Sequence, residues 1–508
     1  MNELTFVPSR AEFIAAAQTG NVIPVYVDVV ADAETPVSAF RKISGRGDSF
    51  LFESAEQNEE FGRFSFLGID PRLVLQSDGR TISVGCEGRD ESFETSADPL
   101  GELQKLMGGY RFVSRPELPR FAGGAVGFVG YDTVRFMEPK VPLPSCDELR
   151  LPEMIFMIMG TLLIFDHRFR RLKVVVNAFT EGRDAAKVFD DAQQQVERVL
   201  SMLSTPAHLP LIDSGRKTSA PEVRSNLSRG EFERLVELAK EYIGAGDVFQ
   251  VVLSQRFETD YAGDPLDLYR CLRLVNPSPY MFCLKFAGRF SLVGSSPEMH
   301  VRVSSGLVQI RPIAGTRPRG ETPEEDERNA GDLLADAKER AEHVMLIDLA
   351  RNDVGRIAEI GSVRLTEQMV IERYSHVMHI VSHVTARLRP EKSAFDVMRA
   401  TFPAGTVSGA PKVRAMQIIS ELEGTKRGCY AGAVGYFGFD GSLDCCIALR
   451  SVVLKEGRAY VQAGAGIVAD SVAAAEYRET VSKARAVIEA VGRASEISTQ
   501  ATHAVDHR

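Results

Sequence analysis

Four strand-like segments follow one another in the middle of the chain: VFQVVLSQRF (248–257), YMFCLKF (280–286), FSLVGS (290–295) and LVQIRPIAG (307–315). They are short, rich in β-branched and aromatic residues and separated by turns, which is the pattern of β-strands. A second group lies near the C-terminus, with AGAVGYFGF (431–439), DCCIALRSVVL (444–454) and AYVQAGAGIV (459–468). Strands grouped in runs, with helices between the groups, predict an α+β fold with large antiparallel β-sheets and flanking helices.

The first two hundred residues show the same alternation of short strands and turns, and they end in one clear helix at 184–203. A stretch rich in Pro, Ser and charge follows without a sustained period, which indicates a linker or surface excursion. Ser228 and Glu231 then form a capping box for a new helix that Gly244 can end. These boundaries predict an N-terminal domain at 1–203, a linker at 204–227, a second domain at 228–495 and a C-terminal tail at 496–508.

Two segments far apart in the chain resemble each other. GGAVGFVGYD (123–132) and AGAVGYFGFD (431–440) share six of ten residues. The similarity is either a coincidence between two strands of small residues or a sign that similar strands of the two halves pair, and the sequence leaves both interpretations open.

The composition is that of an ordinary globular enzyme of 508 residues with a formal net charge of −9. An acidic chain argues against nucleic acid as the partner, because binding phosphate needs a basic face. Seven cysteines without a C-x-x-C pair favour a reducing cytoplasm. No signal peptide is evident at the N-terminus, and the longest apolar run, 154–165, is too short to cross a bilayer and predicts a buried strand.

An acidic helix is predicted at 338–356, KERAEHVMLIDLARNDVGR. Its apolar residues, Val344 among them, recur at helical spacing, so most of the segment is expected to pack inside. Glu339 and Glu342 are three residues apart and share one face. A buried carboxylate is costly unless a metal, a cation or a hydrogen-bond donor compensates it.

A second acidic pair, Glu476 and Glu479, has the same spacing in the last predicted helix. Both helices could simply carry ion-paired ends. Two helices that each offer carboxylates, in a chain without a dense His/Cys cluster, instead suggest a hard divalent cation such as Mg²⁺, which prefers oxygen ligands.

Two glycine-rich segments imitate nucleotide-binding motifs. GAGIVA (464–469) lacks the βαβ context of a dinucleotide fingerprint, and AGTVSGAPK (404–412) lacks the spacing of a P-loop. Gly464 and Gly466 instead let backbone N–H groups approach an anionic substrate. Thr406 and Ser408 could cradle a carboxylate, unless their segment is only a flexible entry to the next helix.

Several basic side chains are further candidates. The segment RPIAGTRPRG (311–320) has three arginines, which suit bidentate carboxylate binding but also occur in solvated turns. Arg450 stands amid the apolar strand predicted at 444–454, where a charge normally has a partner. His379 is one of three histidines in YSHVMHIVSHV (374–384), and a lone histidine is more often structural than catalytic.

Taken together, these motifs closely resemble those of the chorismate-utilising enzymes, over roughly residues 228–490, and within that family the branch that makes anthranilate. The N-terminal half also resembles this branch through FLFESAE (50–56) and RFSFLG (63–68). The resemblance implies chorismate as substrate, Mg²⁺ as cofactor, and large sheets that enclose a central active site.

Site residues carry over from the resemblance position by position. Glu342 and Glu479 match the Mg²⁺ ligands, and Glu339 matches a general acid that helps the C4 hydroxyl leave. His379 matches the histidine that assists removal of the ring proton as pyruvate departs, whereas Glu476 has no role that the resemblance assigns. The positions that match contacts to the carboxylates of the substrate are Thr406, Tyr430, Arg450, Gly464 and Gly466.

Two further positions separate members of the family. Members that use water carry a lysine base where this chain has Gln250, and aminodeoxychorismate synthases carry a nucleophilic lysine where it has Ala314. The resemblance therefore implies attack by ammonia at C2 and release of pyruvate. No GxCxGxQ-like glutaminase motif occurs, so a separate glutamine amidotransferase subunit and a hetero-oligomer are implied.

The segments FLFES (50–54) and NPSPYMF (276–282) resemble the tryptophan feedback pocket of this branch. The implied contacts are Glu53, Ser54, Pro279, Tyr280 and Met281. An aminodeoxyisochorismate or aminodeoxychorismate synthase of the same family is the alternative enzyme. A catalytically silent regulatory subunit is the alternative from another class, and retention of both metal carboxylates argues against it.

Overall fold

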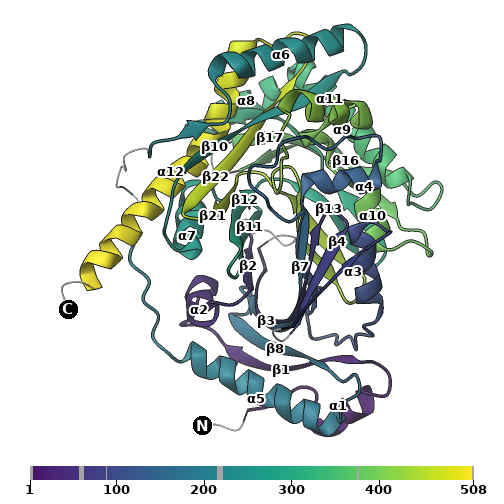
Figure 1. Cartoon of the computed structure of the whole chain (residues 1–508), viewed down its shortest axis with the longest axis vertical. Coiled ribbons are helices and arrows are strands. Elements are labelled where there is room, and N and C mark those ends of the chain that lie inside the picture. Colours follow the sequence, from purple (N-terminus) through teal and green to yellow (C-terminus); the bar gives the residue numbers. More distant parts are fainter. Residues whose placement is uncertain are drawn as a thin grey trace.

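The structure is a computed structural model that describes residues 4–55, 62–86, 89–213, 215, 221–374 and 377–505. Its strands are hydrogen-bonded into one continuous antiparallel network of 22 strands, which folds at β3 and β7 into two layers, here called the first and the second sheet (Figure 1). The first sheet runs through β1 (Val22–Val30), β8 (Arg171–Phe179), β7 (Met154–Asp166), β3 (Phe64–Asp78), β2 (Ser49–Glu53), β11 (Tyr280–Phe286), β12 (Phe290–Ser296), β21 (Ser451–Lys455), β22 (Arg458–Ile467) and β10 (Gln250–Asp260), with β9 (Arg224–Ser225) and β18 (Gly409–Ala410) on β10.

The second sheet shares β3 and β7 with the first. It runs through β5 (Arg89–Glu94), β4 (Thr81–Cys86), β3, β7, β6 (Gly124–Val129), β19 (Ala433–Gly438), β20 (Leu443–Ile447), β13 (Met299–Ser304), β14 (Leu307–Ile310), β17 (Val377–Arg387) and β16 (Arg364–Arg373), with β15 (Ile313–Pro318) also on β17. The expected antiparallel α+β architecture is confirmed.

Two long strands make the corner between the sheets. The first part of β3 pairs with β2 and its second part with β4, and the register of β3 against β7 shifts between Pro71 and Leu73. Strands that switch sheets at such an irregularity are typical of orthogonal packing. Apolar side chains from both sheets, including Phe50, Met157 and Phe282, fill the space between them.

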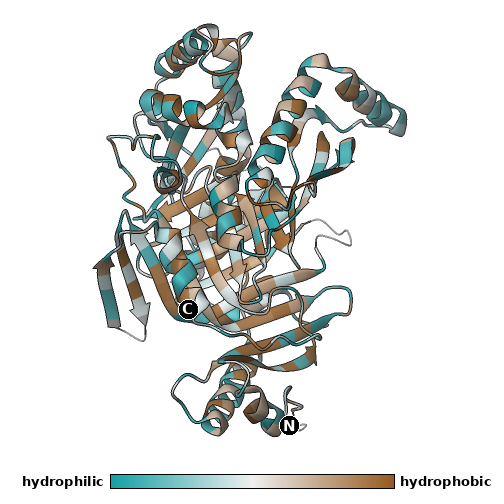
Figure 2. Cartoon of the chain, turned by 90° about the vertical axis from the view of Figure 1, so that its right-hand side faces the viewer, coloured by the Kyte–Doolittle hydropathy of each residue, from teal (hydrophilic) through white to brown (hydrophobic). Residues whose placement is uncertain are grey.

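Helices cover the outer faces of both sheets. The first sheet is covered by α1 (Arg10–Ala16), α2 (Pro36–Ile43), α5 (Ala185–Leu203), α7 (Pro265–Val275) and α12 (Ala473–Val505). The second sheet is covered by α3 (Pro99–Gly108), α8 (Pro323–Ala335), α9 (Ala337–Gly355) and α10 (Ala394–Thr401). Two further helices, α6 (Arg229–Gly244) and α11 (Lys412–Glu423), pack on β10, and the short helix α4 (Val134–Met137) follows β6. Figure 2 shows apolar residues concentrated on the strands in the middle of the molecule. In the described part of the chain, no helix is long and apolar enough to cross a membrane.

Several local predictions are confirmed. The helix expected at 184–203 is α5, capped by Asp184, and the long apolar run is the buried strand β7. The Ser228–Glu231 capping box starts α6, which ends at Gly244. The expected tail begins inside α12, which continues to Val505, and the strands of the two expected domains pair with each other through β2–β11 and β6–β19.

The two similar segments lie side by side. β6 and β19 pair in antiparallel register, with Gly124 opposite Gly438 and Val129 opposite Ala433. Gly124 must stay small for this pairing, because a Cβ there would lie 2.0 Å from the Phe437 carbonyl oxygen of β19. The two similar segments are therefore paired strands, as the second interpretation predicts.

Candidate active site

The candidate site lies where the C-terminal half crosses twice between the sheets. One crossing joins β12 to β13 at Glu298, and the other joins β20 to β21 at Arg450. The two are held together, because the Ile447 N–H donates to the Glu298 carbonyl at 3.0 Å and the Ser295 N–H donates to the Arg450 carbonyl at 3.2 Å. Residues at such crossings leave the regular ladder, so their side chains can point into a site rather than along a sheet face.

The sequence predicted that Arg450 lies within a strand, and this prediction is wrong. It sits in the break between β20 and β21 with a φ of 49°, a left-handed conformation that non-glycine residues seldom adopt. Its guanidinium donates to the Lys483 carbonyl on α12 at 2.6 Å. The apolar run therefore contains two strands of different sheets, and the backbone turn between them places the arginine at the site.

Glu298 is a buried carboxyl group that the sequence prediction missed. The Thr406 hydroxyl, in the turn at 405–407, donates to Glu298 Oε1 at 2.8 Å. Burial raises the pKa of Glu298 to about 8, although the Thr406 hydrogen bond and the charge of Lys483 lower it. At neutral pH this group therefore holds a proton that it can donate. The available signal was a carboxylate in SSPE (295–298) directly after an apolar strand.

Gly464 and Gly466 lie in β22 and leave room for two polar side chains. A Cβ on Gly464 would lie 2.7 Å from the Tyr430 hydroxyl, and one on Gly466 would lie 2.7 Å from Gln250 Nε2. Gln250 Nε2 donates to Glu342 Oε1 at 3.0 Å. These glycines thus bring Tyr430, Gln250 and a carboxylate of α9 to one surface, and the antiparallel β10–β22 ladder confirms that the segment is no dinucleotide fingerprint.

The acids of α9 occupy its first turns, after the cap Asp336. Glu339 lies 3.6 Å from Arg317, and burial and the charge of Glu342 raise the pKa of Glu339. The expectation that Val344 packs inside is wrong, since Val344 is 44% exposed. The buried face instead follows His343, Leu346, Ile347 and Ala350, because one helix side alone faces β15 and β17.

His379, on β17, has a fixed ring orientation. Its Nδ1 lies 2.8 Å from the Gly315 carbonyl, which can only accept, so Nδ1 carries the proton and Nε2 keeps its lone pair. The Thr316 hydroxyl also lies 3.1 Å from Nδ1. Burial lowers the pKa of His379, so the ring stays neutral and Nε2 can accept a proton.

The acids of α12 face the same region. Glu479 pairs with Lys483 at 2.6 Å, and Lys483 donates to the Gly464 carbonyl at 3.1 Å. Lys338 of α9 contacts Asp470, before α12, at 3.3 Å, which brings the N-terminal ends of the two helices together. Lys483 is a second residue that the sequence prediction missed, and the spacing of four from Glu479 was its only signal.

The residues suit a hard divalent cation. Glu342 and Glu479 offer carboxylate oxygens, and Mg²⁺ commonly takes one or two protein carboxylates together with substrate oxygens and water. The described residues contain no group of three or more His, Cys, Asp or Glu side chains placed to hold a metal ion. If Glu342 and Glu479 held Mg²⁺, oxygens of the substrate and water would have to complete its coordination.

The three arginines of the segment at 311–320 bind carboxylates of the protein itself. Arg311 pairs with Glu372, Arg317 with Asp336 at 2.8 Å, and Arg319 with Asp326 at 2.7 Å. Ser408 donates to the Ala404 carbonyl at 3.0 Å, so its hydroxyl stabilises the local turn. The three arginines and Ser408 thus have partners within the protein itself.

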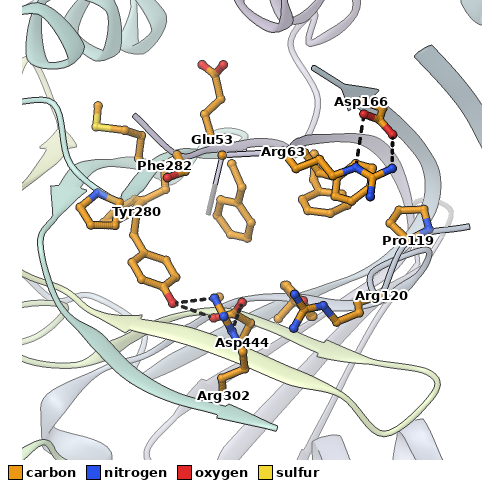
Figure 3. A pocket seen from close by; sticks show the side chains of 18 of the residues that line it. Glu53, Arg63, Pro119, Arg120, Asp166, Tyr280, Phe282, Arg302 and Asp444 are labelled. Carbon is orange, nitrogen blue, oxygen red and sulfur yellow. Dashed lines mark hydrogen bonds and ion pairs between the residues drawn. The ribbon is translucent and has the colours of Figure 1, made fainter. Parts of the chain in front are cut away.

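A separate cavity of about 480 Å³ lies between the halves of the chain. Figure 3 shows it from close by. All five residues expected for tryptophan line it: Glu53, Ser54, Pro279, Tyr280 and Met281. The strand pairing β2–β11, with Glu53 opposite Met281, brings the two sequence motifs together.

The cavity is amphipathic. Phe52, Phe66 and Phe282 contribute aromatic surface. Tyr280 donates to Asp444 at 3.0 Å, and Arg302 pairs with Asp444 at 2.9 Å (Figure 3). The Glu53 carboxylate points away from this cluster and accepts a hydrogen bond from Tyr269 at 2.6 Å. Such a cavity fits a ligand with an aromatic body and a polar end.

The carboxyl groups and the neutral histidine described above are groups that an enzyme can use as acid, base and oxygen ligands for an anionic substrate. The chain belongs to the chorismate binding enzyme family, whose model matches residues 47–489. Within that family it is similar to "Anthranilate synthase component 1" of Pseudomonas putida, with 46% identity over 97% of this chain and 100% of the relative. The protein of that name from Synechocystis is 47% identical over 95% of this chain and 99% of its own.

Solved structures agree with this placement. The crystal structure of anthranilate synthase component I from Streptococcus pneumoniae has a TM-score of 0.75 and 39% identity, and it covers 91% of this chain and 99% of its own. The menaquinone-specific isochorismate synthase from Escherichia coli has a TM-score of 0.71 over 95% of this chain and 99% of its own. Its identity of 16% shows a shared fold alone.

Proposed function

We propose that this chain is the chorismate-converting component of an anthranilate synthase, which forms anthranilate and pyruvate from chorismate and ammonia with Mg²⁺ in the cytoplasm. The observation that carries the proposal is the Gln250–Glu342 contact at 3.0 Å. A neutral amide stands where water-using relatives carry a lysine base, so the site has no group there to activate water. Ammonia is itself a nucleophile and needs no base for attack.

The first step joins nitrogen to C2 and breaks the C4–O bond. Glu298, protonated and held by Thr406, donates its proton to the departing C4 hydroxyl, which leaves as water. The new ammonium group on C2 then releases one proton, which returns Glu298 to its protonated form. We assign the acid to Glu298 rather than to Glu339, because Glu298 is buried and its carboxyl group is held by Thr406 at 2.8 Å, whereas the Glu339 side chain is 26% exposed. Mg²⁺ held by Glu342 and Glu479 would bind the ring carboxylate and stabilise developing charge.

The second step makes the ring aromatic. His379 Nε2 takes the proton from C2, the C3–O bond breaks, and the enolpyruvyl group leaves as pyruvate. Arg450, Tyr430 and the backbone at Gly464 and Gly466 hold the substrate carboxylates, as the resemblance implies. The low pKa of buried His379 keeps it ready as a base between turnovers.

Ammonia is supplied by another subunit in this proposal. Relatives named "component 1" imply a second component, and the sequence contains no glutaminase nucleophile motif. A glutamine amidotransferase is the chemically matching source, because it releases ammonia from an abundant amide.

The ammonia source gives a direct test of the proposed function. The purified chain, incubated with chorismate and Mg²⁺, is expected to produce fluorescent anthranilate with ammonium and none with glutamine. The two nitrogen sources, ammonium and glutamine, are compared at the same pH and ionic strength. Glutamine-dependent turnover by the isolated chain, or no turnover with ammonium, would contradict the proposal.

We further propose that tryptophan binds in the 480 Å³ cavity and that bound tryptophan lowers the rate of anthranilate formation. Support comes from its position, since β2 of the N-terminal half and β11 of the C-terminal half both line it. A ligand that contacts both strands can change their relative arrangement only if it binds one arrangement, the inhibited one, more tightly than the active one. The indole would lie among the phenylalanines, and the polar groups of the ligand would face Ser54 and the polar end of the cavity.

Filling this cavity should relieve inhibition. In Ser54→Phe the larger side chain occupies ligand space, so the tryptophan concentration that halves activity is expected to rise roughly tenfold or more, while the uninhibited rate changes little. Ser54→Ala, which leaves the space open, is the matched control and should remain inhibited. Superimposable inhibition curves for wild type and Ser54→Phe would exclude this cavity as the tryptophan site.

A further inference from the structure

A buried arginine stands behind the candidate active site. The Arg427 side chain is 1% exposed and pairs with Glu423, whose side chain is 3% exposed, through contacts of 2.8 and 2.6 Å. Its guanidinium also donates to the Val407 carbonyl at 2.8 Å and to the Val252 carbonyl at 2.7 Å. One planar group thus connects a helix, a turn and a strand.

Two of the segments that Arg427 holds, the turn and the strand, each carry a proposed site residue. Val407 follows Thr406, which binds Glu298, and Val252 lies two residues after Gln250 on β10. The guanidinium also lies 5.6 Å from the ring centre of Tyr430, whose hydroxyl is the third site group. None of these three side chains belongs to the same element as another.

The paired acid strengthens this connection. Glu423 Oε1 accepts hydrogen bonds from the Ser254 N–H at 2.7 Å and from its hydroxyl at 2.9 Å. The Arg427–Glu423 pair is therefore hydrogen-bonded to β10 at two residues, Val252 and Ser254. This part of β10 pairs with the segment of β22 that contains Gly464 and Gly466. In this ladder Val252 lies opposite Gly466 and Ser254 lies opposite Gly464.

The N-terminal half supports the guanidinium from its other side. Arg427 lies 4.6 Å from the ring centre of Tyr131, a cation–π distance. The Tyr131 N–H donates to the Gly428 carbonyl at 2.9 Å, and the Gly428 N–H donates to Asp132 at 2.8 Å. Tyr131 and Asp132 directly follow β6, the strand that pairs with β19, so both halves of the chain contribute to this arrangement.

We propose that Arg427 is a positioning residue, which fixes the relative places of Thr406, Gln250 and Tyr430 so that they meet one substrate molecule. This role rests on the proposed function. A buried ion pair contributes little to stability compared with apolar side chains of similar size, and it is often retained for geometric specificity. Only a planar fork can reach Glu423 and two carbonyls at once, so lysine is no substitute.

The test compares Arg427→Lys with a matched variant, Arg399→Lys. Arg399 on α10 also bridges the two halves, through paired contacts to Asp98 at 3.1 and 3.2 Å, but it touches none of the proposed site residues. Lysine keeps the charge in both variants, which limits loss of folded protein. Thermal melting and tryptophan binding report the folded fraction, and kcat, KM and the pH profile are measured with ammonium.

Arg427→Lys is expected to fold but to lose about 10²-fold in kcat/KM per folded molecule, since small misplacements of reacting groups have effects of that size. The Thr406 hydrogen bond lowers the pKa of Glu298. If Arg427→Lys displaces Thr406 and this hydrogen bond is lost, the alkaline limb of the pH profile should move to higher pH. Arg399→Lys should retain the wild-type profile. A merely structural role would lower the folded fraction without moving that limb.

The double variant Arg427→Met/Glu423→Gln removes the whole pair and provides a second readout. It should also show reduced kcat/KM per folded molecule if positioning matters. Wild-type kcat/KM and an unmoved alkaline limb in Arg427→Lys and in the double variant would overturn the positioning role while leaving the proposed function intact. A wild-type chain that forms no anthranilate would instead reject the proposed function, and the positioning role with it.

Discussion

Replacing Glu298 by glutamine is expected to lower kcat by about 10²–10⁴-fold, the usual contribution of general acid–base catalysis. Glutamine has nearly the same shape and can keep the Thr406 hydrogen bond, so the turn at 405–407 should stay in place. The variant loses only the proton that leaves with the C4 hydroxyl. Substrate binding, measured as chorismate affinity at equilibrium, should change much less than kcat.

The pH dependence follows from the same group. Burial raises the pKa of Glu298 to about 8, and the acid acts only in its protonated form. Activity should therefore be full below this value and fall as pH rises through it, provided that the concentration of free ammonia is held constant. The alkaline limb should vanish in Glu298→Gln, whose residual activity has no acid to titrate.

Glu339→Gln is the matched control, because Glu339 is the acid that the family resemblance suggested. It is expected to retain the alkaline limb and more activity than Glu298→Gln. The assignment of the acid fails if Glu339→Gln is the more damaged variant while Glu298→Gln keeps near-normal turnover.

Loss of a metal carboxylate is the second large effect. Glu342→Gln and Glu479→Gln should each remove nearly all Mg²⁺-dependent turnover, since a site with only two protein carboxylates loses half of its anionic ligands. Both proteins should stay folded, because Glu479 is exposed and Glu342 is only partly buried. Mg²⁺ binding, followed by calorimetry in the presence of chorismate, should weaken in parallel.

Glu476→Gln offers the control for that experiment. Glu476 lies on α12, three residues before Glu479, and no site contact is assigned to it. It should keep the metal dependence of the wild type. Normal Mg²⁺ dependence in both Glu342→Gln and Glu479→Gln would show that the metal lies elsewhere.

The sequence predicts features that repeat locally. The capping box before α6, the apolar run of β7 and the acid spacing on α9 and α12 are each visible within a few residues. The two motifs expected for a tryptophan pocket were also visible, and β2–β11 pairing brings them together at one cavity. Local patterns of this kind depend little on which distant segment packs against them.

Features that depend on packing were not predictable. The sequence shows Glu298 as one acid after a strand, and only burial beside Thr406 makes it a proton donor. Arg450 reads as a residue inside one strand, whereas its backbone turns between two sheets. Val344 has the same apolar character as its buried neighbours, and only the orientation of α9 leaves it exposed.

The most direct test of the central claim is a product balance with ¹⁵N-labelled ammonium. The chain, chorismate and Mg²⁺ are incubated without a partner subunit, and anthranilate and pyruvate are quantified by mass spectrometry. The account predicts anthranilate that carries the label, with one pyruvate released for each anthranilate. An aminated product that keeps its enolpyruvyl group, or a hydroxylated product without the label, would contradict it.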